Sequence, residues 1–189
     1  CLQEVIHTPT APCDWMEYRD PARILPQRAR FFNDVRRALP NHTATFCPAA
    51  QGVLWDGDTS SPSQWGLATF VRSDLTVIGQ AQGFVYKDFG LDGYGDHPRS
   101  RTGHAVRLWD FDRGQAITIG HMHGLWVPDG KADIPERTQQ AHAFADMIGQ
   151  VANAGDAIVA CGDFNVLPGS DTFDILGAMG LRDLVTGRG

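Results

Sequence analysis

The sequence predicts a layered domain that combines helices with β-sheets, of the α/β or α+β class. Strand-like segments run together in the middle of the chain, whereas strand-like and helix-like segments alternate in its last third. The 189 residues are 42% hydrophobic, which is enough to form a buried core. The sequence contains no visible internal repeat. We therefore expect a single layered domain over residues 1–189.

Charge and composition narrow the functional class. The net charge of −6 argues against a broadly basic surface for nucleic acid, although a few local arginines can still hold a small phosphorylated substrate. No apolar run approaches the ~18 residues that a membrane-spanning helix needs, and no signal peptide is visible. The four cysteines form no Cys-x-x-Cys pair. We expect a cytoplasmic protein with reduced thiols, and we expect it to be a monomer.

The first half of the chain contains one expected helix and two expected strands. Apolar residues recur on one helical face over residues 21–39, and Pro26 could mark the start of that helix. Residues 56–64 are rich in Asp, Ser and Thr, which predicts a surface loop. Residues 66–71 and 75–86 have the composition of strands.

A glycine-rich segment and a hairpin follow. Residues 87–103 are expected to form a second long loop. Residues 104–111 and 115–123 are apolar and β-branched on either side of Asp112-Arg113-Gly114. This pattern predicts a β-hairpin that turns at the Asp-Arg-Gly tripeptide.

The last third predicts helix, strand and helix in succession. The sequence Asp133-Ile134-Pro135-Glu136 is a typical helix start, in which Asp133 would cap the helix. Residues 157–161 are continuously apolar, which predicts a strand that is buried on both faces. A second capped helix is expected to begin near Ser170 or Asp171 and to end at Gly180.

The strongest candidate for a functional site is Gly162-Asp163-Phe164-Asn165, directly after the strand at 157–161. In extended geometry Asp163 and Asn165 point to the same face. A carboxylate and an amide at the mouth of a buried sheet are costly unless they have partners. The sequence therefore indicates either a functional site or a simple Asx turn that ends the strand.

Two histidines form the second candidate. His121 and His123 end the strand at 115–123 and share a face with its isoleucines. Two imidazoles in register at a strand end indicate a site, and a His-x-His pair also suits zinc. No third or fourth metal ligand follows His123 in the sequence. Histidines whose hydrogen bonds are satisfied within the core are the alternative.

Other charged residues are weaker candidates. Arg137 and Gln140 share the inner face of the expected helix, where contact with a buried carboxylate or carbonyl is the preferred interpretation. Glu4 could bind a hard cation or could be a solvated surface residue. Three arginines near the second loop could contact a phosphorylated substrate or could be solvated loop charges. They are Arg99, Arg101 and Arg107.

Taken in order, these motifs resemble the endonuclease/exonuclease/phosphatase superfamily, to which deoxyribonuclease I and inositol polyphosphate phosphatases belong. Leu2-Gln3-Glu4 is similar to the family's metal-binding glutamate motif, and His121-Met122-His123 is similar to its Asn-x-His strand, with His121 in place of Asn. Arg137-x-x-Gln140 matches its Arg-x-x-Gln helix start. Gly162-Asp163-Phe164-Asn165 is its most specific tetrapeptide and is unaltered. Each motif alone is weak, but the ordered set is specific.

The resemblance implies a four-layer α/β/β/α sandwich of two mostly antiparallel sheets, and hydrolysis of phosphate esters with Mg²⁺ or Mn²⁺. It implies that Glu4 binds the metal, that Asp163 orients a water for in-line attack, and that Asn165 and His123 contact the phosphate. The further residues that it implies are His121, Trp126 and Arg101 for substrate binding, and Arg137 and Gln140 for support of the site. The substrate would be a phosphorylated small molecule, a lipid headgroup or a nucleic acid.

Two parts of the family's pattern are absent from the sequence. The family has an Asn-bearing strand before the Leu-Gln-Glu motif and an Asp-His pair near its end, whereas no His follows Asn165 here. We therefore expect that the chain lacks strands at both ends and is weakly active or inactive as it stands. Two other functions remain open: a catalytically impaired relative that acts as a binding module, and a zinc hydrolase that uses His121 and His123.

Overall fold

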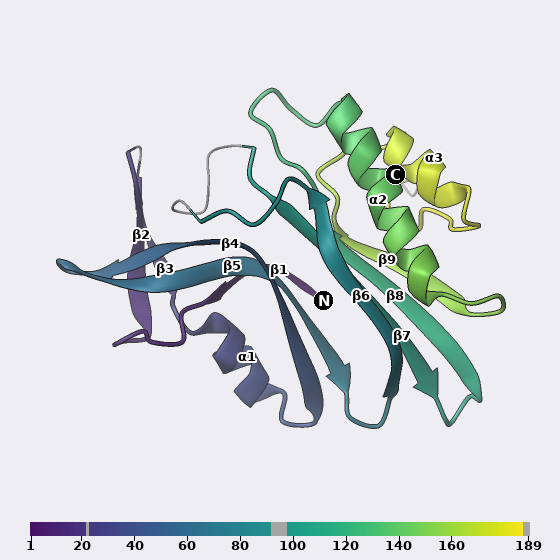
Figure 1. The fold of residues 1–189 in the computed structure, drawn as a ribbon, viewed down its shortest axis with the longest axis horizontal. Helices are drawn as coiled ribbons and strands as arrows, with labels where there is room; N and C mark the ends of the chain where they lie inside the picture. The colour runs from purple at the N-terminus through teal and green to yellow at the C-terminus, as the bar shows by residue number, and fades with distance from the viewer. Residues whose placement is uncertain (22, 92–97, 187–189) are drawn as a thin grey trace.

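Two β-sheets lie face to face in the computed structural model, which describes residues 1–21, 23–91 and 98–186 (Figure 1). The first sheet has the strand order β1 (Leu2–His7), β5 (Thr59–Arg72), β4 (His42–Asp56), β2 (Trp15–Asp20) and β3 (Arg23–Arg28). The second has the order β6 (Thr76–Tyr86), β7 (Arg101–Asp110), β8 (Gln115–His123) and β9 (Ala157–Asp163). All neighbouring strands are antiparallel except β8 and β9, which are parallel.

Helices cover the outer faces of both sheets. Helix α1 (Phe31–Ala38) packs Phe32 against the first sheet, whereas α2 (Pro135–Val151) and α3 (Asp171–Gly177) lie together on the second (Figure 1). Phe144 and Ile148 of α2 are fully buried in the largest apolar cluster. The layer order is therefore α/β/β/α, and the expected four-layer sandwich is confirmed.

The layer between the two sheets contains polar contacts. Thr69 of β5 and His104 of β7 are both buried, and Thr69 Oγ1 lies 2.9 Å from His104 Nδ1. The Cys47 thiol of β4 donates to Gln82 Oε1 of β6 at 3.1 Å. Hydrogen bonds therefore connect the two sheets across an interior in which unpaired polar groups would be costly.

Two predictions for the first half of the chain are wrong. Residues 21–39 are not one helix, because β3 occupies Arg23–Arg28 and only Phe31–Ala38 is helical. Pro26 is tolerated because β3 is the edge strand of its sheet, where a missing N–H leaves no ladder bond unmade. Residues 56–64 are not a loop, since the β4–β5 hairpin continues to Asp56 and resumes at Thr59.

The second half departs from expectation in smaller ways. The loop at 87–103 ends where β7 begins at Arg101, and its residues 92–97 lie outside the described residues. Residues 157–161 form a strand, but β9 is an edge strand and Val159 is 47% exposed, so burial on both faces is wrong. Asp133 does not cap α2, because its carboxylate accepts hydrogen bonds from the Ser170 hydroxyl and the Asp171 N–H instead.

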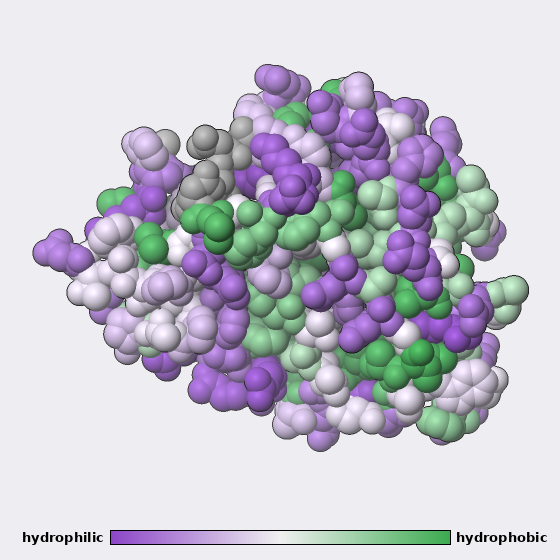
Figure 2. All heavy atoms as spheres, viewed as in Figure 1, coloured by the Kyte–Doolittle hydropathy of each residue, from purple (hydrophilic) through white to green (hydrophobic). Residues whose placement is uncertain are grey.

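Several elements match their predictions closely. The hairpin of β7 and β8 turns at residues 111–114, and α2 begins at Pro135. Ser170 caps α3 by accepting from Thr172 N at 3.2 Å. None of the described helices is long and apolar enough to cross a membrane. Figure 2 shows hydrophilic residues around the outline of the molecule and hydrophobic residues nearer its middle.

Candidate active site

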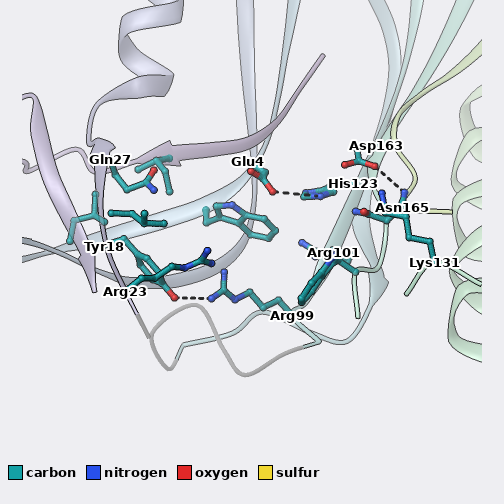
Figure 3. A pocket seen from close by; sticks show the side chains of 15 residues that line it. Glu4, Tyr18, Arg23, Gln27, Arg99, Arg101, His123, Lys131, Asp163 and Asn165 are labelled. Carbon is teal, nitrogen blue, oxygen red and sulfur yellow. Dashed lines mark hydrogen bonds and ion pairs between the residues drawn. The ribbon is translucent and has the colours of Figure 1, made fainter. Parts of the chain in front are cut away.

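A pocket of about 470 Å³ opens between the β2–β3 hairpin of the first sheet and the ends of β8 and β9 in the second (Figure 3). Its walls include Glu4 from β1, His123 from β8 and Asp163 from β9, together with Asn165 and Arg101. With Trp126 and Arg99, which also line it, seven of the residues singled out from the sequence therefore meet in one concave place. Such convergence of polar groups is typical of an active or binding site.

The end of β9 places Asp163 beside His123, because parallel pairing with β8 puts the two residues in register. Gly162 permits this pairing: its φ is +139°, and a Cβ there would lie 1.9 Å from the carbonyl oxygen of Met122. The chain then turns sharply, and Asp163 Oδ1 accepts from Asn165 N at 3.0 Å. This is the Asx turn that the sequence allowed, and it directs two polar side chains into the pocket.

Asn165 is 6% exposed and occupies the left-handed region with φ +54°. Its Nδ2 donates to the carbonyl oxygen of Gly124 at 3.2 Å, which links the segment after β9 to the segment after β8. The second hydrogen of the same amide remains for a ligand. Asn165 thus contributes a donor whose orientation is already held.

Glu4 reaches the pocket through a β-bulge in β1. Pairing with β5 shifts between Leu2 and Val5, and Glu4 has φ +55°, which is unusual for a residue other than glycine. A bulge of this kind redirects a side chain that regular pleating would point elsewhere. The carboxylate is 72% exposed, and its Oε1 lies 4.0 Å from His123 Nε2. It is therefore accessible to a cation.

His123 is 4% exposed and packs against the Trp65 ring, with centroids 5.5 Å apart. Burial lowers the pKa of His123 to about 4, and the nearby Arg101 charge lowers it further in the same direction, while Asp163 opposes this. The imidazole is therefore neutral at pH 7. A neutral imidazole at this position carries one N–H that can be donated to a ligand.

Arg101 is the most unusual charge in the pocket. It is 3% exposed, its guanidinium lies 5.0 Å from the centroid of the Trp65 ring, and its Nε and Nη1 have no hydrogen-bond partner. Burial lowers the pKa of Arg101 to about 10, with Glu4 and Asp163 acting in the opposite direction. Because unpartnered buried charges are costly, the side chain is suited to an anionic ligand.

His121 lies beneath the pocket and is not part of its lining. It is 1% exposed, and its Nε2 accepts from Gln3 Nε2 at 2.7 Å. Its Nδ1 lies 3.5 Å from Thr69 Oγ1. The residue that stands in place of the family's Asn thus contacts the residue that precedes Glu4, at the base of the bulge.

Arg137 and Gln140 hold the segment that follows β8. Gln140 Oε1 accepts from Leu125 N at 2.8 Å, and Arg137 donates to the carbonyl oxygens of Leu125, Gly130 and Ala132. Both side chains are completely buried, and neither lines the pocket. Trp126, which this segment carries, is 39% exposed and lines the pocket.

The opposite wall was missed by sequence reasoning. It consists of Tyr18, Arg23 and Gln27 from the β2–β3 hairpin. Lys131, from the segment before α2, was also missed, and it lies on the side of Asn165 (Figure 3). The hairpin was missed because residues 21–39 were predicted to be a helix, although Pro26 within this range argued against one. Arg107, a candidate from the sequence, does not line the pocket and instead pairs with Asp156 at 2.7 and 2.9 Å.

The donor set fits a hard cation better than zinc. Within residues 1–21, 23–91 and 98–186, no group of three or more His, Cys, Asp or Glu side chains is arranged to hold a metal ion. Mg²⁺ does not require such a cage, because it binds through one or two carboxylates, waters and substrate phosphate oxygens. The accessible carboxylate of Glu4, at the rim of a pocket suited to anions, meets that requirement.

Comparison with known proteins identifies the fold. No protein-family model matches the sequence, and none of the curated proteins matches it. An endonuclease/exonuclease/phosphatase from Bacteroides vulgatus matches at TM-score 0.54 and 20% identity, over 78% of this chain and 52% of that one. The mannosyl-6-phosphatase Bt3783 of Bacteroides thetaiotaomicron matches at TM-score 0.54 and 14% identity, over 79% and 52%.

A third structure, ANGEL2, described as a 2′,3′-cyclic phosphatase in complex with adenosine-2′,3′-vanadate, matches at TM-score 0.51 and 18% identity, over 82% of this chain and 44% of that one. The chain thus spans about half the length of the solved structures that it matches. The likeness extends over both sheets and confirms the resemblance at the level of architecture. The chain has the fold of the endonuclease/exonuclease/phosphatase structures.

Proposed function

We propose that the pocket binds and hydrolyses a phosphate ester with the help of Mg²⁺ or Mn²⁺. The observation that carries this proposal is the convergence of Glu4, His123 and Asp163, from three different strands, around the unpartnered guanidinium of Arg101. Two solved structures of the same fold are described as phosphatases, one for a mannosyl-6-phosphate and one for a 2′,3′-cyclic phosphate. Both descriptions support phosphoester chemistry at such a site.

Asp163 is the group proposed to orient the attacking water. One of its oxygens accepts from Asn165 N, which holds the carboxylate while the other oxygen faces the pocket. The side chain is exposed, and a carboxylate oxygen accepts hydrogen bonds from water. A water held there would lie in line with a phosphorus atom bound near His123 and Asn165, as in-line displacement requires.

The donors that would bind the phosphoryl oxygens surround that position. Arg101 has two unused guanidinium nitrogens, Asn165 has an amide hydrogen, and neutral His123 has one N–H. Donors that are held in place before the reaction stabilise the charge that develops on the phosphoryl oxygens. Trp126, which also lines the pocket, is proposed to contact the remainder of the substrate.

Glu4 is proposed to hold the divalent cation, with waters and substrate oxygens completing its coordination. The cation would neutralise charge on the phosphoryl group. Arg137 and Gln140 would support the site by fixing the segment after β8, and His121 would support it through Gln3. The substrate class is a phosphorylated small molecule, a lipid headgroup or a nucleic acid, and the pocket volume of about 470 Å³ favours the first.

The test is hydrolysis of bis-p-nitrophenyl phosphate and of p-nitrophenyl phosphate by the full-length protein with Mg²⁺, with Zn²⁺ and with chelator. We expect Mg²⁺-dependent turnover that Asp163→Asn reduces by about 10²-fold or more, because a positioned base contributes roughly that factor. Asp146→Asn, an exposed carboxylate on α2, is the matched control and should keep full activity.

Each other outcome contradicts the proposal. Full activity of Asp163→Asn would remove the assigned water-orienting group. Turnover with Zn²⁺ only would favour the zinc hydrolase, and absence of turnover with every metal would favour a binding module.

A further inference from the structure

The wall of the pocket opposite Asp163 carries a second group of cationic side chains. Arg23 extends from β3, and Arg99 extends from the segment before β7. Figure 3 shows both guanidinium groups beside Tyr18, on the side away from Asp163 and Asn165. They are therefore separated from the groups proposed to act on the cleaved phosphate.

Arg99 is held in place but not neutralised. Its Nη2 donates to the Tyr18 hydroxyl at 2.9 Å, and its guanidinium lies 5.8 Å from the centroid of the Tyr18 ring. Its Nε is buried without a hydrogen-bond partner, and no carboxylate in the described part of the chain lies within 4.0 Å of it. Arg23 is loosely paired with Asp20 at 3.5 Å and is 61% exposed, so it can still turn to a ligand.

Among the described residues, two guanidinium groups with no carboxylate within 4.0 Å thus face one pocket. Arg101 lies near the proposed phosphate position, and the Arg99 side chain extends from the same stretch of chain toward Tyr18 (Figure 3). Besides burial, the positive charge of Arg99 lowers the pKa of Arg101, as expected for two neighbouring cations. Two bound anions would reduce the repulsion between these cations and would pair both groups.

Part of the pocket lining is apolar. Ile6, Leu54 and Trp65 contribute to it, and the first two are almost fully buried. Such a floor suits the carbon skeleton of a small molecule, and a pocket of about 470 Å³ has the size of a small-molecule site. A long polyanion would instead meet the rest of a chain whose net charge is −6.

We propose that Arg99, positioned by Tyr18 and assisted by Arg23, forms a second anion subsite, so that the preferred ligand is a small molecule with two phosphoryl groups. One group occupies the position near Arg101, His123 and Asn165, and the second is held by Arg99. The assignment of the first position rests on the proposed function, whereas the second stands on the geometry of Arg99.

The test measures binding rather than turnover, in the presence of chelator so that no hydrolysis occurs. Isothermal titration with fructose 1,6-bisphosphate and fructose 6-phosphate compares two probes that differ by one phosphoryl group. We expect the bisphosphate to bind at least tenfold more tightly to the unmodified protein. Arg99→Gln should reduce this preference to below threefold while changing the affinity for the monophosphate by less than threefold.

Two further variants make the result specific. Tyr18→Phe removes the hydroxyl that holds Arg99 and should reduce the preference by a smaller factor, with the fold intact. Arg19→Gln is the matched control: Arg19 also lies on β2, but it pairs with Glu17 and does not line the pocket, so the preference should stay unchanged.

The inference is overturned if the two sugar phosphates bind equally, or if Arg99→Gln keeps the preference. It is also overturned if a tetrathymidylate binds more tightly than the bisphosphate, which would favour a nucleic acid. Arg101→Gln separates the two proposals, because it should weaken the monophosphate at least tenfold. If it does not, the phosphate position of the proposed function is wrong, whatever Arg99→Gln shows.

Discussion

The two histidines of β8 lie two residues apart on the same face, yet their surroundings differ. His123 faces the pocket, whereas His121 lies below it between Gln3 and Thr69. Strand alternation predicted their common face correctly. It could not predict their depth, because depth depends on β1 and β5, which reach this position only through the packing of the two sheets.

Burial of His121 should make the stability of the protein depend on pH. Its pKa is lowered to about 3 in the folded state, mainly by burial, from an ordinary value of 6.5. Between these values the unfolded chain binds the proton and the folded chain does not, so stability is full above pH 6.5 and decreases as the pH falls. We expect a contribution of about 1.4 kcal/mol per pH unit from this group below pH 6.5.

Urea unfolding at pH 7, 6, 5 and 4.5 measures this slope. His121→Gln should show a shallower slope than the unmodified protein, and His142→Gln, an exposed position on α2, should not change it. Equal slopes for the two variants would contradict the assignment.

Glu4 gives the second prediction at this scale. Mg²⁺ at about tenfold its dissociation constant should raise the melting temperature by about 3–6 °C, because ligands that bind only the folded state stabilise it. Glu4→Gln removes the carboxylate charge and should abolish this increase. Glu136→Gln, an exposed position in the first turn of α2, should retain it. A full Mg²⁺ shift in Glu4→Gln would show that the cation binds elsewhere.

Among single elements, β9 depends on one glycine. A Cβ at Gly162 would lie 1.9 Å from the Met122 carbonyl oxygen, and its φ of +139° disfavours any other residue. Gly162→Ala should therefore separate the ends of β8 and β9, lower the free energy of unfolding by about 2 kcal/mol or more and reduce turnover.

The matched control is Gly149→Ala within α2, where a Cβ meets nothing within 4 Å. This change should stabilise the protein by up to about 1 kcal/mol, because alanine favours helices more than glycine does. Thermal unfolding of both variants checks the pair. A loss of stability only in Gly149→Ala would reverse the expectation.

Helices and strands whose position depends on residues close in the sequence were predicted well, and those that depend on distant contacts were not. The β7–β8 hairpin and the start of α2 depend on neighbouring residues, and both were predicted well. The β2–β3 hairpin also has a short turn, but its apolar residues mimic a helical period, so β3 was taken as helix. Pro26 is acceptable because β3 lies at the edge of its sheet. The position of a strand in a sheet depends on the whole fold and cannot be predicted from a short stretch of sequence.

For the whole molecule, the site depends on how the two sheets pack. Glu4 comes from the first sheet, and His123 and Asp163 come from the second. The family-like motifs in their sequence order predicted that these residues converge. Arg99 was a candidate from the sequence, but its contact with Tyr18 was not predictable, because β2 and the segment before β7 meet only in the assembled sandwich.

The packing of the two sheets can be tested at the contact of Thr69 with His104. Thr69→Val removes the hydroxyl and leaves a buried imidazole nitrogen without its partner, so we expect a loss of about 1–3 kcal/mol in the free energy of unfolding. Thr76→Val, at an exposed position of β6, should change it by less than about 0.5 kcal/mol. Urea unfolding measures both, and equal effects would mean that the hydroxyl does not contribute to sheet packing.

The left-handed backbone at Glu4 and Asn165 lowers the stability of the fold, whereas the side chains at these positions are the ones that the proposed activity requires. Within the described residues, only three non-glycine positions have positive φ, and these two line the pocket. Glycine would relax the backbone at either position, but it would remove the side chain that the site uses. Selection for thermostability alone would therefore favour glycine at these two positions, and those substitutions would inactivate the protein. An engineering library should keep both positions fixed.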